Sequence, residues 1–226
     1  MNIKEAAQTV DNPPPINWEW LAGFFQAEGS IGSFFDRMGC YYAPRITISQ
    51  VEDEILYRIA DFLKIAQPNT SLGVYGKKDT HPASSLVVRY RKNTQLLCVQ
   101  VAPYLRSTML SKLRETCNQC RMDVDGDVQD WSWDFVAGFW EGDGCLGRTA
   151  FSCQVNFDQA DEALLQEVRD FLRTGSVFLT TGITYRLNLS DDLDNLPIHR
   201  KLLEYSRTHF RRVQLAGAIL GEEHEL

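Results

Sequence analysis

Large apolar residues recur at three- and four-residue spacing in two stretches of the chain, residues 21–29 (LAGFFQAEG) and 136–144 (VAGFWEGDG). The recurring positions are Leu21, Phe24 and Phe25 in the first stretch and Val136, Phe139 and Trp140 in the second. This period predicts two helices, one over about residues 17–28 and one ending at residue 143, each with one stripe buried in a core. Both stretches end in an acid and a glycine, and we expect the glycine to end its helix because it tolerates the left-handed conformation.

Small residues form a second stripe on each predicted helix. They are Gly23 and Ala27 in the first copy and Gly138 and Gly142 in the second. Small side chains four residues apart let two helix backbones approach closely. Helices packed along these stripes would place Glu28 and Asp143 side by side at two C-terminal helix ends, where the helix dipole is already negative. Adjacent carboxylates are unfavourable there unless a cation lies between them, and their hard oxygen atoms suit Mg²⁺ or Ca²⁺.

The two stretches, with their approaches Trp18-Glu19-Trp20 and Trp133-Asp134-Phe135, resemble the motifs of the LAGLIDADG homing endonucleases. Two degenerate copies are similar to the single-chain form of that family, which carries both motifs. The resemblance implies an α+β fold of two pseudo-twofold αββαββα repeats. The repeats pack through the motif helices, and their antiparallel sheets form a saddle that binds DNA. One glycine-rich amphipathic helix alone would instead be typical of ordinary close packing.

The order of predicted elements is the same in both halves. We divide the chain into an N-terminal arm (1–16), a first repeat (17–121), an acidic linker (122–130) and a second repeat (131–226). Alternation of apolar and polar residues predicts the strands. These span about residues 30–37, 41–50, 71–77 and 84–91 in the first half, with a hairpin ending near 158 and another over 176–180 and 183–189 in the second. Because both halves share the motif-helix interface, we expect one cooperative unit.

The strand residues that alternate with the apolar ones form an outward face rich in basic, amide and hydroxyl side chains, and we expect this face to contact DNA. It comprises Arg45, Thr47, Tyr75, Lys77, Arg89 and Arg91 from the first half and Ser152, Gln154, Asn156, Thr184, Arg186 and Asn188 from the second. This set contains no carboxylate. Strands can enter a major groove and read base edges. Any half-buried sheet shows a polar face to water, but the absence of acids from the set and the motif pair favour DNA.

Composition limits the class of protein. The net charge of −7 argues at first sight against a nucleic-acid binder, yet the acids lie mostly on predicted helices, in the linker and near the C-terminus. The six cysteines lack the spacing of a disulfide or zinc framework, so we expect reduced, mostly buried thiols. No apolar run is long enough to span a bilayer. We therefore expect a soluble intracellular protein, with a bacterial cytoplasm and an organelle left undistinguished.

Phosphodiester hydrolysis needs a positioned water and neutralisation of the charge that develops on phosphate, which metal ions held by carboxylates can supply. The resemblance implies Mg²⁺ bound by Glu28 and Asp143 and by the carbonyls of Ala27 and Gly142, with Ca²⁺ occupying the same sites without supporting cleavage. It also implies cleavage of both strands across the minor groove, giving short 3′ overhangs. The strand-end residues Gln50 and Gln159 match the family's polar residues that order water near the metals.

The chain departs from the family at a basic position. Members often carry a lysine in the last helical region of each repeat, where this chain has Thr108 and His209. We take His209 and Lys112 as the candidate catalytic cations. The alternatives are Arg106, Arg207 and Arg211, and the competing interpretation for all of these side chains is a solvated helix charge.

The function that we predict is that of a monomeric, site-specific, Mg²⁺-dependent double-stranded DNA endonuclease that promotes intron homing. The first alternative is a cleavage-deficient nucleic-acid-binding protein on the same fold, either a maturase that binds the host intron RNA or a transcription regulator. Intact Glu28 and Asp143 favour the enzyme, and the missing lysines favour this alternative. A second alternative, suggested only by the acidity, is a structural or protein-binding module.

Overall fold

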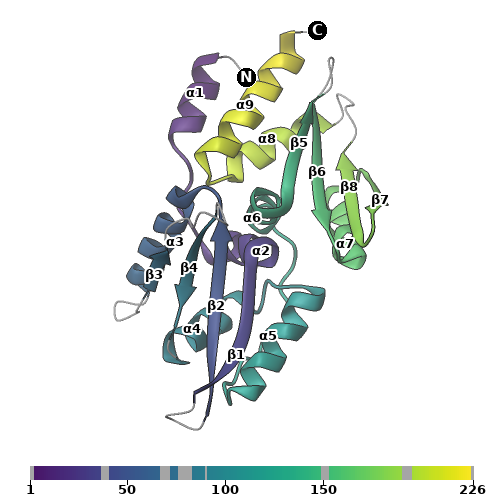
Figure 1. Cartoon of the computed structure of the whole chain (residues 1–226). Helices are drawn as coiled ribbons and strands as arrows, with labels where there is room; N and C mark the ends of the chain where they lie inside the picture. The colour runs from purple at the N-terminus through teal and green to yellow at the C-terminus, as the bar shows by residue number, and fades with distance from the viewer. Residues whose placement is uncertain are drawn as a thin grey trace.

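The computed structural model of the chain describes residues 3–36, 41–66, 72–75, 83–89, 91–148, 153–189 and 195–224. Helix α1 (Ile3–Asp11) precedes two halves that run through the same series of elements (Figure 1). The first half contains α2 (Trp18–Glu28), β1 (Gly29–Asp36), β2 (Tyr41–Gln50), α3 (Asp53–Ala66), β3 (Leu72–Tyr75), β4 (Ser84–Val88), α4 (Arg91–Val101) and α5 (Ser107–Gln119). The second contains α6 (Trp133–Asp143), β5 (Gly144–Arg148), β6 (Cys153–Gln159), α7 (Glu162–Leu172), β7 (Ser176–Thr181), β8 (Thr184–Leu189), α8 (Leu196–Tyr205) and α9 (His209–His224).

The two sheets share one topology. Both are antiparallel, with strand orders β1-β2-β4-β3 and β5-β6-β8-β7. Alternate strand residues point inward and are almost fully buried against the helices. These residues are Ile46, Ile48, Leu86 and Val88 in the first sheet and Val155, Phe157, Leu187 and Leu189 in the second. The predicted α+β fold of two similar repeats is therefore confirmed.

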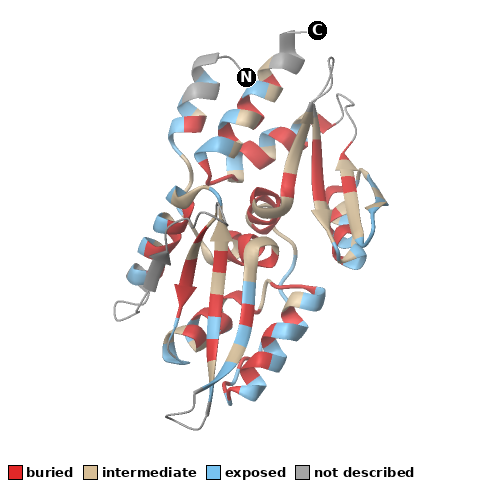
Figure 2. Cartoon of the chain, in the orientation of Figure 1, coloured by how far each residue is buried: buried red, intermediate tan, exposed pale blue. Residues whose placement is uncertain are grey.

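Helices α2 and α6 cross between the two sheets and are buried over most of their length (Figures 1 and 2). Each begins at a side-chain cap, Asn17 Oδ1 accepting from Trp20 N at 2.8 Å and Ser132 Oγ from Phe135 N at 3.2 Å. The small-residue stripes form the contact. A Cβ on Gly23 would lie 2.0 Å from the Phe135 carbonyl oxygen, which confirms the predicted close approach of the two backbones.

The glycines that follow the two acids are required for a different reason from the one expected. Gly29 has φ −82° and Gly144 has φ −84°, so neither adopts the left-handed conformation, and that expectation is wrong. A Cβ on Gly29 would lie 2.0 Å from the ring of Phe25, and a Cβ on Gly144 would lie 2.1 Å from the ring of Trp140. Both positions need glycine because a large aromatic ring of the same helix covers them.

The N-terminal arm contains a helix that docks on the second half. Helix α1 packs against α9 and more lightly against α8 (Figure 1). Buried Arg212 of α9 donates to backbone carbonyls of the arm, including Val10 at 3.3 Å and Thr9, and to the carbonyl of Ser206 at 2.6 Å. One guanidinium therefore ties the arm to the start of α9.

Candidate functional site

Glu28 and Asp143 are the last residues of α2 and α6, and the packing of these helices brings the two acids together. A Cβ on Gly142 would lie 2.3 Å from the Cβ of Ala27 and 3.0 Å from Cγ of Glu28. Both acids are partly exposed at the mouth of the helix pair. The predicted pair of adjacent carboxylates is thus present, with the carbonyls of Ala27 and Gly142 one residue before each acid.

Each acid is held by a glutamine from the end of a neighbouring strand. Gln50 Nε2 donates to Glu28 Oε1 at 3.3 Å, and Gln159 Nε2 donates to Asp143 Oδ2 at 2.6 Å. The Oε1 atoms of the same glutamines accept from the next backbone N–H, that of Val51 at 2.7 Å and that of Ala160 at 2.8 Å. This second bond fixes the orientation of both amides, so the NH₂ group faces the carboxylate in both halves.

The two carboxyl groups bind protons unusually well. Burial raises the pKa of Glu28 to about 7, although the charge of Arg211 and the hydrogen bond from Gln50 act to lower it. Burial raises the pKa of Asp143 to about 8, and the nearby carboxylates of Glu28 and Asp158 add to the effect. Two such groups cannot both ionise readily at neutral pH unless a cation joins them.

The surroundings of the two acids differ. Arg211 of α9 donates through Nη2 to the carbonyl of Gly144 at 2.5 Å, and its guanidinium lies 5.2 Å from the Trp140 ring centroid. Its charge acts on Glu28, as noted above, whereas the neighbours that act on Asp143 are acidic. The matching position of the first repeat, two residues after Thr108, is the buried and uncharged Leu110.

The two candidate catalytic cations, Lys112 and His209, lie elsewhere. Lys112 is exposed on α5, and His209 is exposed at the start of α9, where its charge acts on Glu52. Within the described part of the chain, no hydrogen bond or ion pair joins either of them to Glu28 or Asp143. Arg211 was predicted only as an alternative cation, because no sequence pattern indicates that the start of α9 lies beside the motif helices.

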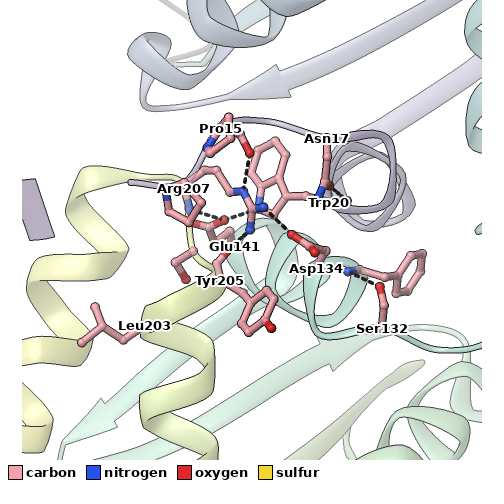
Figure 3. Close-up of polar contacts among 12 residues, drawn as sticks. Pro15, Asn17, Trp20, Ser132, Asp134, Glu141, Leu203, Tyr205 and Arg207 are labelled. Carbon is pink, nitrogen blue, oxygen red and sulfur yellow. Dashed lines mark hydrogen bonds and ion pairs between the residues drawn. The ribbon is translucent and has the colours of Figure 1, made fainter. Parts of the chain in front are cut away.

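The other two alternatives, Arg106 and Arg207, are buried and bind groups away from Glu28 and Asp143. Arg106 donates to the carbonyls of Tyr104 at 2.6 Å and Leu105 at 3.2 Å. Arg207 lies between the arm and α6, where it bonds to Asp134 and to the carbonyl of Pro15 (Figure 3). Arg106 therefore stabilises the turn before α5, and Arg207 connects the N-terminal arm to α6.

A buried carboxylate, Glu141, fixes the start of α9 relative to the motif helices (Figure 3). It accepts from Trp20 Nε1 at 2.5 Å, from Arg207 N at 2.8 Å and from Thr208 N at 2.6 Å. In the first repeat the amide of Gln26 has this place and accepts from Arg106 N at 3.0 Å. Glu141 was not among the predicted site residues, although it is an acid within a helix of apolar and small residues.

The outward strand face is present in both sheets, with two corrections. Strand β4 ends at Val88, and Arg91 begins α4, where it bonds to the carbonyl of Arg121, so its place on the strand face is wrong. The face also carries a carboxylate, because Asp158 lies opposite Arg186 and binds it through both oxygens at 2.7 and 2.8 Å. Asp158 is the next outward position after Asn156, where the predicted set ends, so the expectation of a face without acids is wrong.

The structure places the remaining predicted contact residues differently. Arg45, Thr47 and Thr184 lie on the outward face, at least partly exposed, and Arg89 is exposed directly after the end of β4. Gln154, Asn156 and Asn188 form an amide cluster on the outward face, in which Asn188 Nδ2 donates to Asn156 Oδ1 at 2.7 Å and Asn156 is only 3 % exposed. Tyr75 of β3 pairs with Ser85 of β4 at an outward register position, and Lys77 and Ser152 lie outside the described residues.

Among the described residues there is no group of three or more His, Cys, Asp or Glu side chains arranged to hold a metal ion. No helix in that part of the chain is long and apolar enough to cross a membrane.

Comparison with known proteins identifies the fold. No family model and no curated protein matches the sequence. Solved structures match nearly the whole chain. One is LAGLIDADG meganuclease I-AabMI bound to uncleaved DNA, with a TM-score of 0.61 and 14% identity over 93% of this chain and 91% of that chain. A second is LAGLIDADG homing endonuclease I-GzeII in complex with its DNA target, with a TM-score of 0.59 and 15% identity over 93% of each chain. A third is I-SmaMI bound to an uncleaved DNA target in the presence of calcium ions, with a TM-score of 0.59 and 12% identity over 93% of this chain and 92% of that chain. The chain therefore has the fold of the LAGLIDADG homing endonucleases, in the single-chain form with two motif repeats.

Proposed function

We propose that this protein is a site-specific endonuclease that cleaves both strands of double-stranded DNA with Mg²⁺ as its metal ion. The observation that carries the proposal is the pair of acids, Glu28 and Asp143, that end two packed helices, each held by an amide from its own repeat. Structural packing alone does not call for two partly buried acids side by side, because their repulsion and desolvation oppose folding.

The DNA would lie across the outward faces of the two sheets. Solved structures of the same fold are described as bound to DNA, which supports this choice of partner. The face combines exposed Arg45 and Arg89 with the amides of Gln154 and Asn188, groups that hydrogen-bond to base edges and phosphates. Acting as a monomer, one chain would present both sheets to one long target, consistent with a role in intron homing.

The site has the donors that Mg²⁺ prefers. This ion is commonly bound by one or two carboxylates together with phosphate oxygens and waters, and Glu28 and Asp143 would supply two carboxylates. Glu28, Asp143 and the carbonyls of Ala27 and Gly142 would hold it, and Ca²⁺ would occupy the same positions without supporting cleavage. A bound ion supplies Lewis-acid polarisation of the phosphate and a water of lowered pKa.

The chain's own residues would position the other reactants. Gln50 and Gln159 each donate to one oxygen of a carboxylate, Glu28 Oε1 and Asp143 Oδ2, and so would hold the two acids in a fixed orientation. Arg211 places a positive charge beside Glu28, where it can offset negative charge that develops on a phosphate. Two acids, one from each repeat, would serve two scissile phosphates that face each other across the minor groove, which gives short 3′ overhangs.

A cleavage selection tests this proposal. Purified protein is incubated with a plasmid pool of random inserts in Mg²⁺ and, separately, in Ca²⁺, with Asp143→Asn as the matched variant. We expect discrete double-strand breaks in Mg²⁺ only, and loss of cleavage of at least one strand in the variant with DNA binding retained. Full cutting by Asp143→Asn would remove this residue from the site.

The second candidate is a binding protein of this fold that no longer cuts, either an intron maturase that binds RNA or a transcription regulator. The observation in its favour is the absence of a described basic side chain acting on Asp143, together with the engagement of Thr108 Oγ1 by Asp161 at 2.7 Å at one of the positions where the family often has lysine. Retention of specific DNA fragments without any cut in Mg²⁺ would support this candidate, and splicing of the host intron would be the next assay.

A further inference from the structure

Two phenylalanines lie on the outward strand faces and remain open to solvent. Phe34 of β1 is 44 % exposed and Phe178 of β7 is 47 % exposed. Phe34 pairs with Ala43, two residues from the Arg45 pair, and Phe178 pairs with Arg186. Both therefore share the face of the arginines and amides rather than the face that packs on the helices.

Neither ring is covered by the fold. The guanidinium of Arg45 lies 5.1 Å from the centroid of the Phe34 ring and packs along one side of it. Arg186, opposite Phe178, is held at the strand surface by both oxygens of Asp158. Each ring is thus flanked by an ordered cation and keeps nearly half of its surface accessible.

The chemistry of the major groove restricts what such a ring can contact. Its base edges present hydrogen-bond donors and acceptors, and the apolar group among them is the C5-methyl of thymine. A ring placed on a donor or acceptor would remove water without replacing its hydrogen bond, which is unfavourable. A ring placed on a methyl group gains from burial of apolar surface on both sides.

We propose that Phe34 and Phe178 each recognise a thymine of the target through its C5-methyl group. This inference rests on the proposed function, because it requires DNA on the outward faces. It names a substrate feature that the acids and the metal site do not determine: an A·T pair in a defined orientation below each ring.

The position of the first thymine follows from the chain. Phe34 lies six residues after Glu28 along a strand that begins directly at the acid, so at about 3.3 Å per residue it reaches about 20 Å from the cleavage site. At 3.4 Å per base step this is about six base pairs from the cut. Phe178 lies on the outer edge strand of the other sheet, so the two thymines are not related by the pseudo-twofold symmetry.

The corresponding edge strand of the first sheet places another aromatic residue at the matching register position. Tyr75 on β3 pairs with Ser85, whose β2 partner is Ser49, just as Phe178 on β7 pairs with Arg186, whose β6 partner is Asp158. The edge strands thus carry an aromatic residue at the same point in both repeats.

Substitution of deoxyuridine for thymidine tests the inference, because it deletes the methyl group and leaves the hydrogen-bonding pattern intact. Each thymine of the selected target is replaced singly, and the Kd is measured in Ca²⁺ for the wild type, Phe34→Ala and Phe178→Ala. We expect one deoxyuridine on each side of the cut to weaken wild-type binding about fourfold, the contribution of one buried methyl-sized group. Each penalty should vanish in its own alanine variant and persist in the other. Tyr57→Ala, which removes an exposed ring from α3, is the matched control and should keep both penalties.

The outcomes separate the inference from the function on which it rests. Cleavage at a unique site with no deoxyuridine penalty, or with penalties that both alanine variants retain, would overturn the inference and leave the endonuclease intact. Protein that neither binds nor cuts DNA would overturn both.

Discussion

Replacing Asp143 by asparagine should stabilise the metal-free protein while it abolishes cleavage of at least one DNA strand. The carboxyl group is partly buried next to two other acids, Glu28 and Asp158, and asparagine keeps its size while removing the charge. The asparagine Oδ1 can still accept the hydrogen bond that Gln159 Nε2 donates at 2.6 Å. The substitution therefore removes the electrostatic cost of the site without opening a cavity.

The magnitude follows from the pKa of Asp143, which rises from 3.8 to about 8 on folding. Between these values the folded chain holds a proton that the unfolded chain releases, so the free energy of unfolding falls as the pH rises from about 4 to about 8. Four pKa units correspond to about 5 kcal/mol. Water reaches this partly exposed group and screens the effect, so we expect about 3 kcal/mol at pH 8 and almost no effect at pH 4.

Chemical denaturation in EDTA measures this difference. Wild type and Asp143→Asn are unfolded at pH 4.5 and at pH 8.5, and the difference between their free energies of unfolding should grow with pH in favour of the variant. Asp161→Asn is a control of opposite sign. Burial acts to raise the pKa of Asp161, but hydrogen bonds from Ser107, Thr108 and Leu164 N outweigh it and lower the pKa, so this variant should lose stability at pH 8.5.

Two results would refute the reasoning. An Asp143→Asn variant no more stable than wild type at pH 8.5 would mean that the carboxylate of Asp143 is ionised at little cost, and the case for a cation between the acids would lose its electrostatic basis. An increase in the free energy of unfolding of the same size at pH 4.5 and pH 8.5 would show that the stabilisation comes from packing rather than from the charge of Asp143. Addition of Mg²⁺ should raise the stability of the wild type more than that of the variant, because only the wild type keeps both carboxylates.

Further substitutions test the helix contact, the charge near Glu28 and the strand face. Gly138→Ala should lower the free energy of unfolding by about 3 kcal/mol, because its Cβ would lie 2.1 Å from the Trp20 carbonyl, whereas Gly217→Ala, open on α9, should raise it by about 0.5–1 kcal/mol. Arg211→Gln should slow single-turnover cleavage by about 10²-fold with a smaller change in Kd measured in Ca²⁺. Equal losses in both would make Arg211 a binding residue. Arg186→Ala should weaken binding or relax specificity by about 1–3 kcal/mol if it reads a base, and an unchanged base preference in a target selection would show that it does not.

Local signals predicted the parts of the site that belong to the motifs. The small residues at 23 and 138 indicated the helix contact, and the acid before each terminal glycine indicated where two carboxylates would meet. The glutamines at 50 and 159 were found because each half repeats the same order of residues. Each of these predictions needed only the helix period and the duplication.

What the sequence did not reveal depends on contacts between distant segments. Arg211 reaches Gly144 only because Glu141 holds the start of α9, and neither bond has a counterpart in hydrophobic periodicity. Arg91 was misplaced because a basic residue at the end of an alternating run is compatible with both a strand end and a helix start. Asp158 is one outward position beyond Asn156, where the predicted set ended, and its ion pair with Arg186 joins two strands that are separated in sequence by a helix and another strand.

The docking of α1 on α9 determines how this protein could be divided or recombined. A cut at residues 122–130 falls between α5 and α6, yet it would leave the segment that Arg212 and Arg207 bind attached to the wrong fragment. A chimera that takes its second repeat from a relative would need residues 3–16 from that relative as well. The recombination unit of the second half is therefore discontinuous in sequence, and exchange of whole repeats at the linker alone should yield halves that fold poorly.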